Sequence, residues 1–378
     1  MDENRYTPEL RFEGFTEPWK QQELGNIAKI VAGGDVDKRR LRPTGKYSVL
    51  ANALTNDGIV GYYDDSYRIE APAVTVTGRG EVGHAKARFA PFTPVVRLLA
   101  VITKSDVSFI AEAINLTNIA LESTGVPQLT VPQLASVQLR IPDTVEEQQA
   151  IGTFFHKLDS LIALQQRKYE RLQHLKQALL RKMFPKPGEQ VPELRFEGFT
   201  EPWKRQKLGD IAEVTMGQSP NGSCYTDNPE DPILVQGNAD LRDGWVFPRV
   251  WTTQVTKTAR AGDLIMSVRA PVGAIGKTAY DVVLGRGVCG IKGNEFLFQF
   301  LSKLELEKYW FSVSTGSTFD SINGDELRAT PIFMPTSIQE QEAIGSLLSR
   351  LDSFITLYQR KYERLQHLKQ ALLQRMFV

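Results

Sequence analysis

The chain has few of the residues that build metal centres or disulfide frameworks. Among its 378 residues there are two cysteines, Cys224 and Cys289, and four histidines, with no paired Cys/His spacing. These numbers exclude a disulfide framework and a four-cysteine zinc site, so we expect no metal ion bound by this chain. No apolar run approaches the ~20 residues of a membrane span, and the polar start MDENRYTPEL is unlike a signal peptide. We expect a cytoplasmic protein.

Catalytic motifs are missing as well. The stretch GAIGKT at 273–278 has Pro271 where a phosphate-binding loop requires glycine. No Glu is followed two residues later by Lys, as in metal-dependent nucleases, and no nucleophile, base and orienting group come together. We therefore expect no catalytic residue and no cofactor bound by this chain. Because the net charge is only +1, any DNA-binding surface must come from local clusters of basic residues.

What the chain does contain is a duplication. The segment PELRFEGFTEPWK stands at 8–20 and again at 192–204, and residues 146–184 match 339–377 with 27 of 39 positions identical. Shorter matches lie in the inserts between these blocks: RGEVG at 79–83 with RAPVG at 269–273, and STG at 123–125 with STG at 314–316. One ancestral domain has been doubled. Recent recombination could explain the identical blocks; alternatively they bind one common partner while the inserts bind different targets.

Each copy of the long block predicts one long helix. Mostly apolar residues recur in steps of four and three from Ile151 to Leu172, which is a heptad seam. Capping boxes are predicted from Thr144 with Glu147 and from Ser337 with Glu340. The seam favours an antiparallel pair of helices, although each helix could instead pack on its own insert. The seam residues expected at the coiled coil or a partner interface are Phe155, Leu158, Ile162, Tyr169, Leu172, Leu348, Leu351, Ile355, Tyr362 and Leu365.

The two inserts predict mixed α/β globules with strand–turn–strand patterns around glycines. Basic residues lie on these turns, and polar residues able to read base edges follow each STG. Since arginine binds guanine edges or phosphates, the turns predict DNA contacts; the alternative is ordinary solvated loop charge. The DNA-binding candidates are Arg79, His84, Lys86, Arg88, Gln128, Thr130, Arg269, Lys277, Arg286, Ser317 and Thr318.

The repeats, with STGSTFDSINGDELRATPIFMP and the long block beginning QEQEAIGSLLSRLDSF, resemble the specificity subunit of type I restriction–modification enzymes over essentially the whole chain. The second half is the more similar through RAPVG and GRGV, and the first half lacks GRGV. The resemblance implies an α+β fold, in which two α/β target-recognition globules are held apart by two long antiparallel coiled-coil helices with pseudo-two-fold symmetry.

The resemblance also implies a function in phage defence. A non-catalytic DNA-recognition subunit of this kind reads a bipartite double-stranded DNA sequence, with one recognition domain for each half-site. It docks two methyltransferase subunits, which use S-adenosylmethionine, and restriction subunits that use ATP and Mg can join. The alternative from another class is a coiled-coil scaffold that joins two protein partners without DNA.

Six segments follow from the repeats and the resemblance. They are an N-terminal segment (1–20), recognition domain 1 (21–145), long helix 1 (146–186), a repeated connecting segment (187–204), recognition domain 2 (205–338) and long helix 2 (339–378).

Overall fold

The computed structural model describes residues 6–119, 127–313 and 321–377, and the chain divides into two compact units. Unit 1 runs to Gln165 and also contains the chain from Lys361 onward, whereas unit 2 is Gln166–Arg360. Two long helices, α4 (Val145–Lys182) and α9 (Ile338–Met376), each contribute to both units. Each unit therefore combines a globule with the first part of one helix and the last part of the other.

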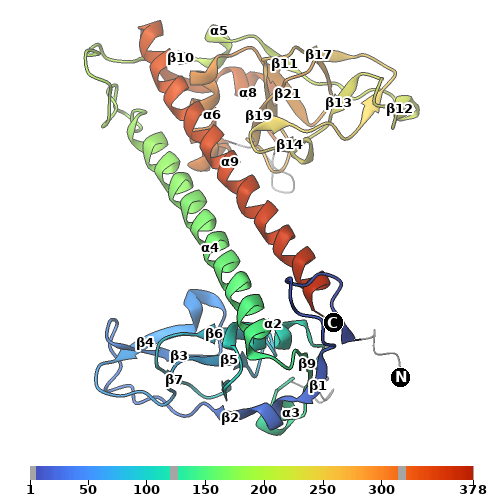
Figure 1. Ribbon diagram of the computed structural model, residues 1–378. Helices are drawn as coiled ribbons and strands as arrows, with labels where there is room; N and C mark the ends of the chain where they lie inside the picture. Colours follow the sequence, from blue (N-terminus) through green and yellow to red (C-terminus); the bar gives the residue numbers. More distant parts are fainter. Residues whose placement is uncertain (1–5, 120–126, 314–320, 378) are drawn as a thin grey trace. The chain divides into compact units, whose positions relative to one another are not determined.

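Strands of unit 1 form a four-stranded sheet, β2-β8-β5-β6, a three-stranded sheet, β4-β3-β7, and the pair β1-β9 (Figure 1). Its strands are β1 (Lys20–Glu23), β2 (Ala28–Ala32), β3 (Tyr47–Leu50), β4 (Ile59–Tyr63), β5 (Ala73–Thr77), β6 (Ala85–Arg88), β7 (Phe92–Pro94), β8 (Leu98–Thr103) and β9 (Gln138–Ile141). Its shorter helices are α1 (Leu24–Ile27), η2 (Thr55–Gly58), α2 (Val107–Leu116) and α3 (Val131–Ala135).

Strands of unit 2 form a six-stranded sheet, β11-β21-β18-β19-β15-β14, a five-stranded sheet, β12-β16-β13-β20-β17, and the pair β10-β22. The strands are β10 (Lys204–Lys207), β11 (Val214–Met216), β12 (Tyr225–Thr226), β13 (Ile233–Val235), β14 (Leu241–Arg242), β15 (Trp245–Val246), β16 (Trp251–Thr252), β17 (Lys257–Ala259), β18 (Leu264–Ser267), β19 (Ile275–Lys277), β20 (Val282–Leu284), β21 (Val288–Ile291) and β22 (Pro331–Met334). The shorter helices are α5 (Leu208–Ile211), η3 (Gly222–Cys224), η4 (Asn238–Asp240), α6 (Glu295–Leu306), α7 (Tyr309–Val313) and α8 (Gly324–Arg328).

Strand pairing shows that the two globules share one scaffold. β3 pairs in parallel with β7 and antiparallel with β4, and β13 pairs in the same way with β20 and β16. A glycine follows β2 in unit 1 and β11 in unit 2. A Cβ would lie 2.0 Å from a backbone carbonyl oxygen at Gly33 and 2.1 Å from one at Gly217, so no larger residue fits. The predicted duplication and the mixed α/β character of the inserts are thus confirmed.

The long helices run antiparallel within each unit, as predicted. As α4 advances along the chain, its contacts move backward along α9. The contacting pairs are Phe155 with Phe377 and Asp159 with Lys369 in unit 1, and Lys168 with Tyr358 and Lys176 with Asp352 in unit 2. The first turns of each helix also pack into the core of their own globule, through Phe155 and Leu348. Both packing modes considered for these helices therefore occur together.

The repeated block PELRFEGFTEPWK clamps the start of each long helix. In unit 1 the buried carboxylate of Glu147 accepts hydrogen bonds from Arg11 Nε at 2.7 Å and from Trp19 Nε1 at 3.3 Å. Unit 2 repeats these contacts at the same distances, with Arg195 and Trp203 on Glu340. Of the predicted capping boxes, one half is present in unit 2, where Ser337 Oγ accepts from the Glu340 N–H at 3.4 Å. The reciprocal half is wrong, because the carboxylates of Glu147 and Glu340 bind the block instead.

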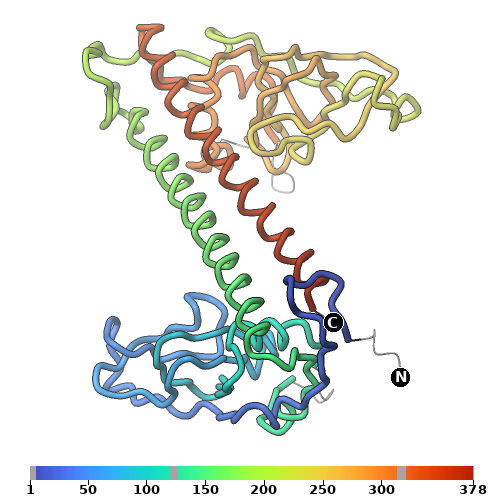
Figure 2. The backbone as a smooth tube through the Cα atoms, in the orientation of Figure 1, coloured from blue at the N-terminus to red at the C-terminus, as the bar shows by residue number. Residues whose placement is uncertain are grey.

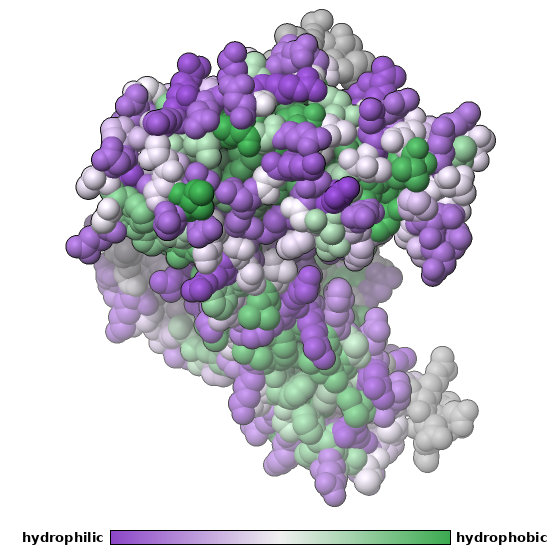
Figure 3. All heavy atoms as spheres, turned by 90° about the horizontal axis from the view of Figure 1, so that it is seen from above, coloured by the Kyte–Doolittle hydropathy of each residue, from purple (hydrophilic) through white to green (hydrophobic). Residues whose placement is uncertain are grey.

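The same block also joins each globule to the end of the other helix. The Leu10 N–H donates to the Arg375 carbonyl at 2.8 Å, and the Leu194 N–H donates to the Lys182 carbonyl at 2.8 Å. Figure 2 shows the first contact, where the N-terminal block (blue) lies beside the end of α9 (red). The two cores are apolar, while the face in Figure 3 is mostly hydrophilic with separate apolar patches.

Candidate nucleic-acid interface

The turn after β5 carries the first predicted DNA-binding arginine. The Asn52 side chain fixes this turn, since its Oδ1 accepts from the N–H groups of Gly78 at 2.7 Å and Arg79 at 3.2 Å. Its Nδ2 donates to the Arg79 carbonyl at 2.6 Å. Arg79 also forms an isolated β-bridge with Gln128, so two residues predicted separately lie side by side. Within the described part of the chain, the Arg79 guanidinium has no ion pair.

A second arginine stands beside that turn and was not predicted. Arg97 is exposed, and its carbonyl accepts from the Gly78 N–H at 2.9 Å. Its φ of +74° lies in the left-handed region, which costs a non-glycine residue roughly 1–2 kcal/mol. Such strain gathers at functional sites. Comparison by letters missed Arg97 because the stretch opposite GRGV reads VVRL.

Unit 2 presents Arg269 on the equivalent turn after β18. Arg269 bridges to Ser321 as Arg79 bridges to Gln128. Arg286 lies on the neighbouring turn between β20 and β21, where its backbone N–H donates to Ser219 Oγ at 3.2 Å. Both arginines are exposed, and neither guanidinium has an ion pair among the described residues. The predicted Ser317 and Thr318 lie outside the described residues.

Four other candidates of unit 1 lie at or near these turns. Lys86 and Arg88 both bind Asp57, Arg88 Nη1 at 2.7 Å. Burial alone would raise the pKa of Asp57, but the two cations outweigh it and hold the pKa below its ordinary value. Thr130 caps α3, its Oγ1 accepting from the Gln133 N–H at 3.4 Å. His84 is exposed on the turn before β6. Lys86, Arg88 and Thr130 thus already have partners within unit 1.

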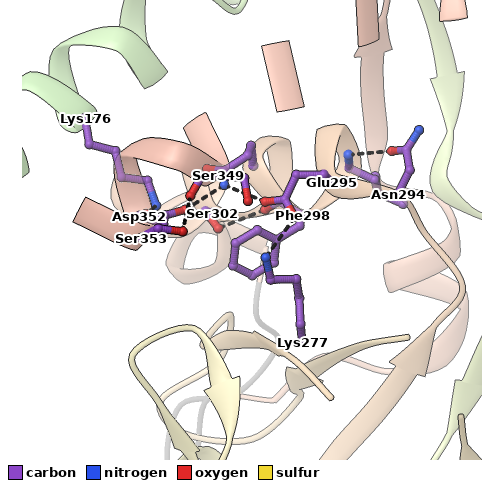
Figure 4. Close-up of polar contacts among 11 residues, drawn as sticks. Lys176, Lys277, Asn294, Glu295, Phe298, Ser302, Ser349, Asp352 and Ser353 are labelled. Atoms are coloured by element: carbon purple, nitrogen blue, oxygen red, sulfur yellow. Dashed lines mark hydrogen bonds and ion pairs between the residues drawn. The ribbon is translucent and has the colours of Figure 1, made fainter. Parts of the chain in front are cut away.

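Lys277 is engaged inside unit 2. Its ammonium binds Glu295 at 2.8 Å and lies 4.8 Å from the ring centroids of both Trp245 and Phe298. Figure 4 shows it pointing from β19 toward Phe298 and Glu295. Cation–π and ionic contacts of this kind fix a side chain. Of the predicted basic residues, Arg79, Arg269 and Arg286 are therefore the best placed to meet a ligand.

The predicted seam residues differ in burial along each helix. Those nearest the helix starts are buried: Phe155, Leu158, Leu348 and Leu351. The remaining ones are half-buried: Ile162, Tyr169, Leu172, Ile355, Tyr362 and Leu365. One local contact repeats in both copies, since Gln173 Nε2 donates to Tyr169 Oη at 2.7 Å and Gln366 Nε2 donates to Tyr362 Oη at 2.8 Å.

One lysine in each unit ties the helix pair to its globule. In unit 1, Lys369 Nζ binds Glu112 at 2.6 Å and Asp159 at 2.7 Å. In unit 2, Lys176 binds Asp352, whose other oxygen accepts from Gln299 Nε2 at 2.7 Å (Figure 4). Burial raises the pKa of Glu112 despite the opposing attraction of Lys369.

Two other kinds of feature are absent from the described part of the chain. The described residues contain no cluster of three or more His, Cys, Asp or Glu side chains placed to hold a metal ion. Among their helices, none combines the length and apolar character needed to cross a membrane.

Comparison with known proteins places both halves in one family. Residues 16–174 and 200–367 each match the family described as type I restriction modification DNA specificity domain. The putative type I restriction enzyme MjaX specificity subunit of Methanocaldococcus jannaschii is 27% identical over 66% of this chain and 61% of its own length. The putative type I specificity subunit S.MpnORF507P of Mycoplasma pneumoniae is 29% identical over 36% of this chain and 39% of its own. The chain thus matches less than two thirds of either relative.

A solved structure shares the fold across nearly the whole chain. The type I restriction–modification system S subunit of M. genitalium aligns with a TM-score of 0.69 and 15% identity, covering 98% of this chain and 99% of that one. The fold defines the class as a duplicated α+β protein with two related globules. The chain belongs to the type I restriction–modification DNA specificity family.

Proposed function

We propose that this chain is the DNA-recognition subunit of a type I restriction–modification complex and reads a split sequence, one half with each unit. The observation that carries the proposal is the repeated turn, on which Arg79 and Arg269 occupy equivalent places of equivalent sheets. The side chains around the two turns differ, and base contacts are what specify sequence. One scaffold with two unlike sets of contact residues suits two different half-sites.

The chemistry is assigned to partner subunits. Methyltransferase subunits carrying S-adenosylmethionine would methylate the DNA, and restriction subunits using ATP and Mg²⁺ would cut it. This chain would recognise the target sequence, and the complex would act in the cytoplasm. The subunit itself is proposed to be non-catalytic and to bind no cofactor. The family to which both halves belong supports this division of labour.

The long helices offer repeated surfaces for a partner present in two copies. Three leucines of α4 are exposed, and the residues at the same three positions of α9 are exposed and apolar too. They are Leu161, Leu164 and Leu175 on α4, and Phe354, Leu357 and Leu368 on α9. Exposed apolar groups of this kind mark interaction sites, and a repeated surface can bind one partner twice. We assign these positions to two methyltransferase subunits.

The test is to reconstitute the chain with its methyltransferase subunits and to sequence the methylated adenines in modified DNA. A split sequence with a fixed spacer is expected; one unbroken word would contradict the proposal. Methylation or cutting by the purified chain alone would overturn its non-catalytic role. A scaffold that never contacts DNA would show no salt-dependent binding to duplex.

A further inference from the structure

A second basic surface of unit 1 lies outside the turns already described. Residues 35–46, DVDKRRLRPTGK, join β2 to β3 and are called the basic arm here. It contains five basic residues and two acidic ones, Asp35 and Asp37. Among the described residues, Arg40 is the only one of the five basic residues with an ion pair, to Asp65 at 2.6 Å. The other four are exposed and have no ion pair within the described part of the chain: Lys38, Arg39, Arg42 and Lys46.

The basic arm is anchored to the sheet. The Arg42 N–H donates to the Tyr62 carbonyl at 3.0 Å, and the Tyr62 N–H donates back to the Arg42 carbonyl at 2.9 Å. At the other end of the arm, the Tyr63 hydroxyl accepts from the Asp37 N–H at 2.9 Å. Leu41 packs over Gly61, where a Cβ would lie 2.6 Å from Leu41 Cγ. The cations thus project from a fixed backbone, which lowers the entropy lost on binding.

The basic arm continues the surface that carries Arg97. The Gly34 carbonyl, one residue before the arm, accepts from the Val96 N–H at 3.0 Å, and the Gly34 N–H donates to Pro94 at 3.2 Å. Arg68 Nη2 adds a hydrogen bond to the Asp35 carbonyl at 3.0 Å. Backbone hydrogen bonds therefore connect the Arg97 turn directly to the start of the basic arm.

Unit 2 has the opposite charge at the corresponding place. Residues 217–232, between β11 and β13, contain no lysine or arginine and three acidic residues, Asp227, Glu230 and Asp231. Where Arg42 bridges to β4, unit 2 pairs β12 with β16 and exposes Tyr225. The arm is a property of one unit and not of the shared scaffold.

We propose that the basic arm binds the DNA phosphate backbone beside the half-site read by unit 1, and that unit 2 binds its half-site without equivalent phosphate contacts. This inference rests on the proposed function. Phosphate is the favoured ligand because the four cations are exposed and have no ion pair within the described part of the chain, and phosphate contacts need charge but no base-specific geometry. Salt would then weaken binding at the half-site of unit 1 more strongly than binding at the half-site of unit 2.

The test compares K38A/R39A with wild type in the complex with methyltransferase subunits. Kd for a duplex containing the mapped target is measured between about 50 and 200 mM salt, since each lost phosphate contact lowers the slope of log K against log salt by roughly 0.9. We expect the slope to fall by up to about 2 with the methylated sequence unchanged. K204A/K207A on β10, which removes two exposed lysines of unit 2, should leave the slope unchanged.

Ethylation interference locates the lost contacts. In K38A/R39A, ethylated phosphates should lose their effect beside one half-site only. Equal slopes for variant and wild type, or an equal loss in the lysine control, would overturn the proposal. So would intact DNA binding with weakened subunit assembly, which would make the arm a docking site for an acidic protein. If wild type itself shows no salt-dependent binding, the proposed function fails first.

Discussion

The two units pair their strands alike and cover them with different side chains. Between β2 and β3, unit 1 carries five basic and two acidic residues, whereas unit 2 carries no basic residue and three acidic ones between β11 and β13. Backbone ladders need no particular side chain beyond the close approach at Gly33 and Gly217. Surface loops are therefore free to diverge while the sheets stay the same, which is how one scaffold acquires two binding surfaces.

The helical side of each unit shows the opposite behaviour. Lys369 and Asp159 of unit 1 are the same pair as Lys176 and Asp352 of unit 2. Only the third member differs, since Glu112 completes the first cluster and Gln299 the second. Contacts that hold the helix pair have been kept, and contacts that belong to the globule have changed.

The largest expected effect is common to both units. Arg11→Ala leaves the carboxylate of Glu147, 2% exposed, without its cation, and breaking a buried pair in this way costs about 3–5 kcal/mol. Arg195→Ala should cost the same, because Glu340 is 1% exposed and held at the same distances. Urea denaturation of each variant measures the loss in free energy of unfolding.

A matched control is Arg328→Ala, which removes an exposed pair with Asp325 and should cost at most about 0.5 kcal/mol. Destabilisation below about 1 kcal/mol in either arginine variant, or in one unit only, would contradict the equivalence of the two clamps.

A smaller effect separates the units by specificity. Arg79→Ala should relax one half-site and Arg269→Ala the other, each by about 1–3 kcal/mol of discrimination at one base pair. Sequencing of methylated adenines gives the result directly. Lys86→Ala is the comparison, because that lysine is bound to Asp57 and should leave both half-sites unchanged. Relaxation of the same half by both arginine variants would break the assignment.

The smallest effect comes from the lysine clusters. Lys369→Met leaves Glu112, with a side chain 10% exposed, beside Asp159, and should cost about 2 kcal/mol at neutral pH. Lys176→Met leaves one carboxylate, Asp352, that still accepts from Gln299, and should cost about 1 kcal/mol less. Adding Glu112→Gln to the first variant should recover most of the difference.

The pH dependence of Lys369→Met has a definite sign. The pKa of Glu112 is raised in the folded state, so the folded chain binds that proton more tightly than the unfolded chain, and stability falls as pH rises above the ordinary pKa. Without Lys369 the free energy of unfolding should fall more steeply with pH. The difference in unfolding free energy between Lys369→Met and wild type should therefore be larger at pH 8 than at pH 5. A gap independent of pH would show that Glu112 is not the group left exposed to repulsion.

The sequence predicted the helices and the duplication well, because heptads and exact repeats are local signals. Prediction from the sequence failed for side chains whose partners are far away in the chain. Glu147 has a local capping pattern, yet Arg11, far away in the chain, takes its carboxylate. Lys86 resembles a free cation until Asp57 is brought to it. Arg97 was missed because the turns match in hydrogen bonding and not in letters.

The signal for the basic arm was present in the sequence. Residues 38–42 read KRRLR, a dense run of the kind that marks nucleic-acid contact. The glycine turns recur in both halves of the sequence, whereas this run occurs in the first half alone. Comparison of repeats finds what the two halves share, and it overlooks what one half has alone.

The most direct test of two units reading two half-sites is a chain in which residues 204–334 replace 20–141. The junctions fall on equivalent strand pairs, because Lys20 pairs with Ile141 in unit 1 and Lys204 pairs with Met334 in unit 2. In complex with the methyltransferase subunits, this chain should methylate an inverted repeat of the half-site that Arg269→Ala relaxes. Methylation of the wild-type sequence, or of one that keeps the half-site relaxed by Arg79→Ala, would contradict the account.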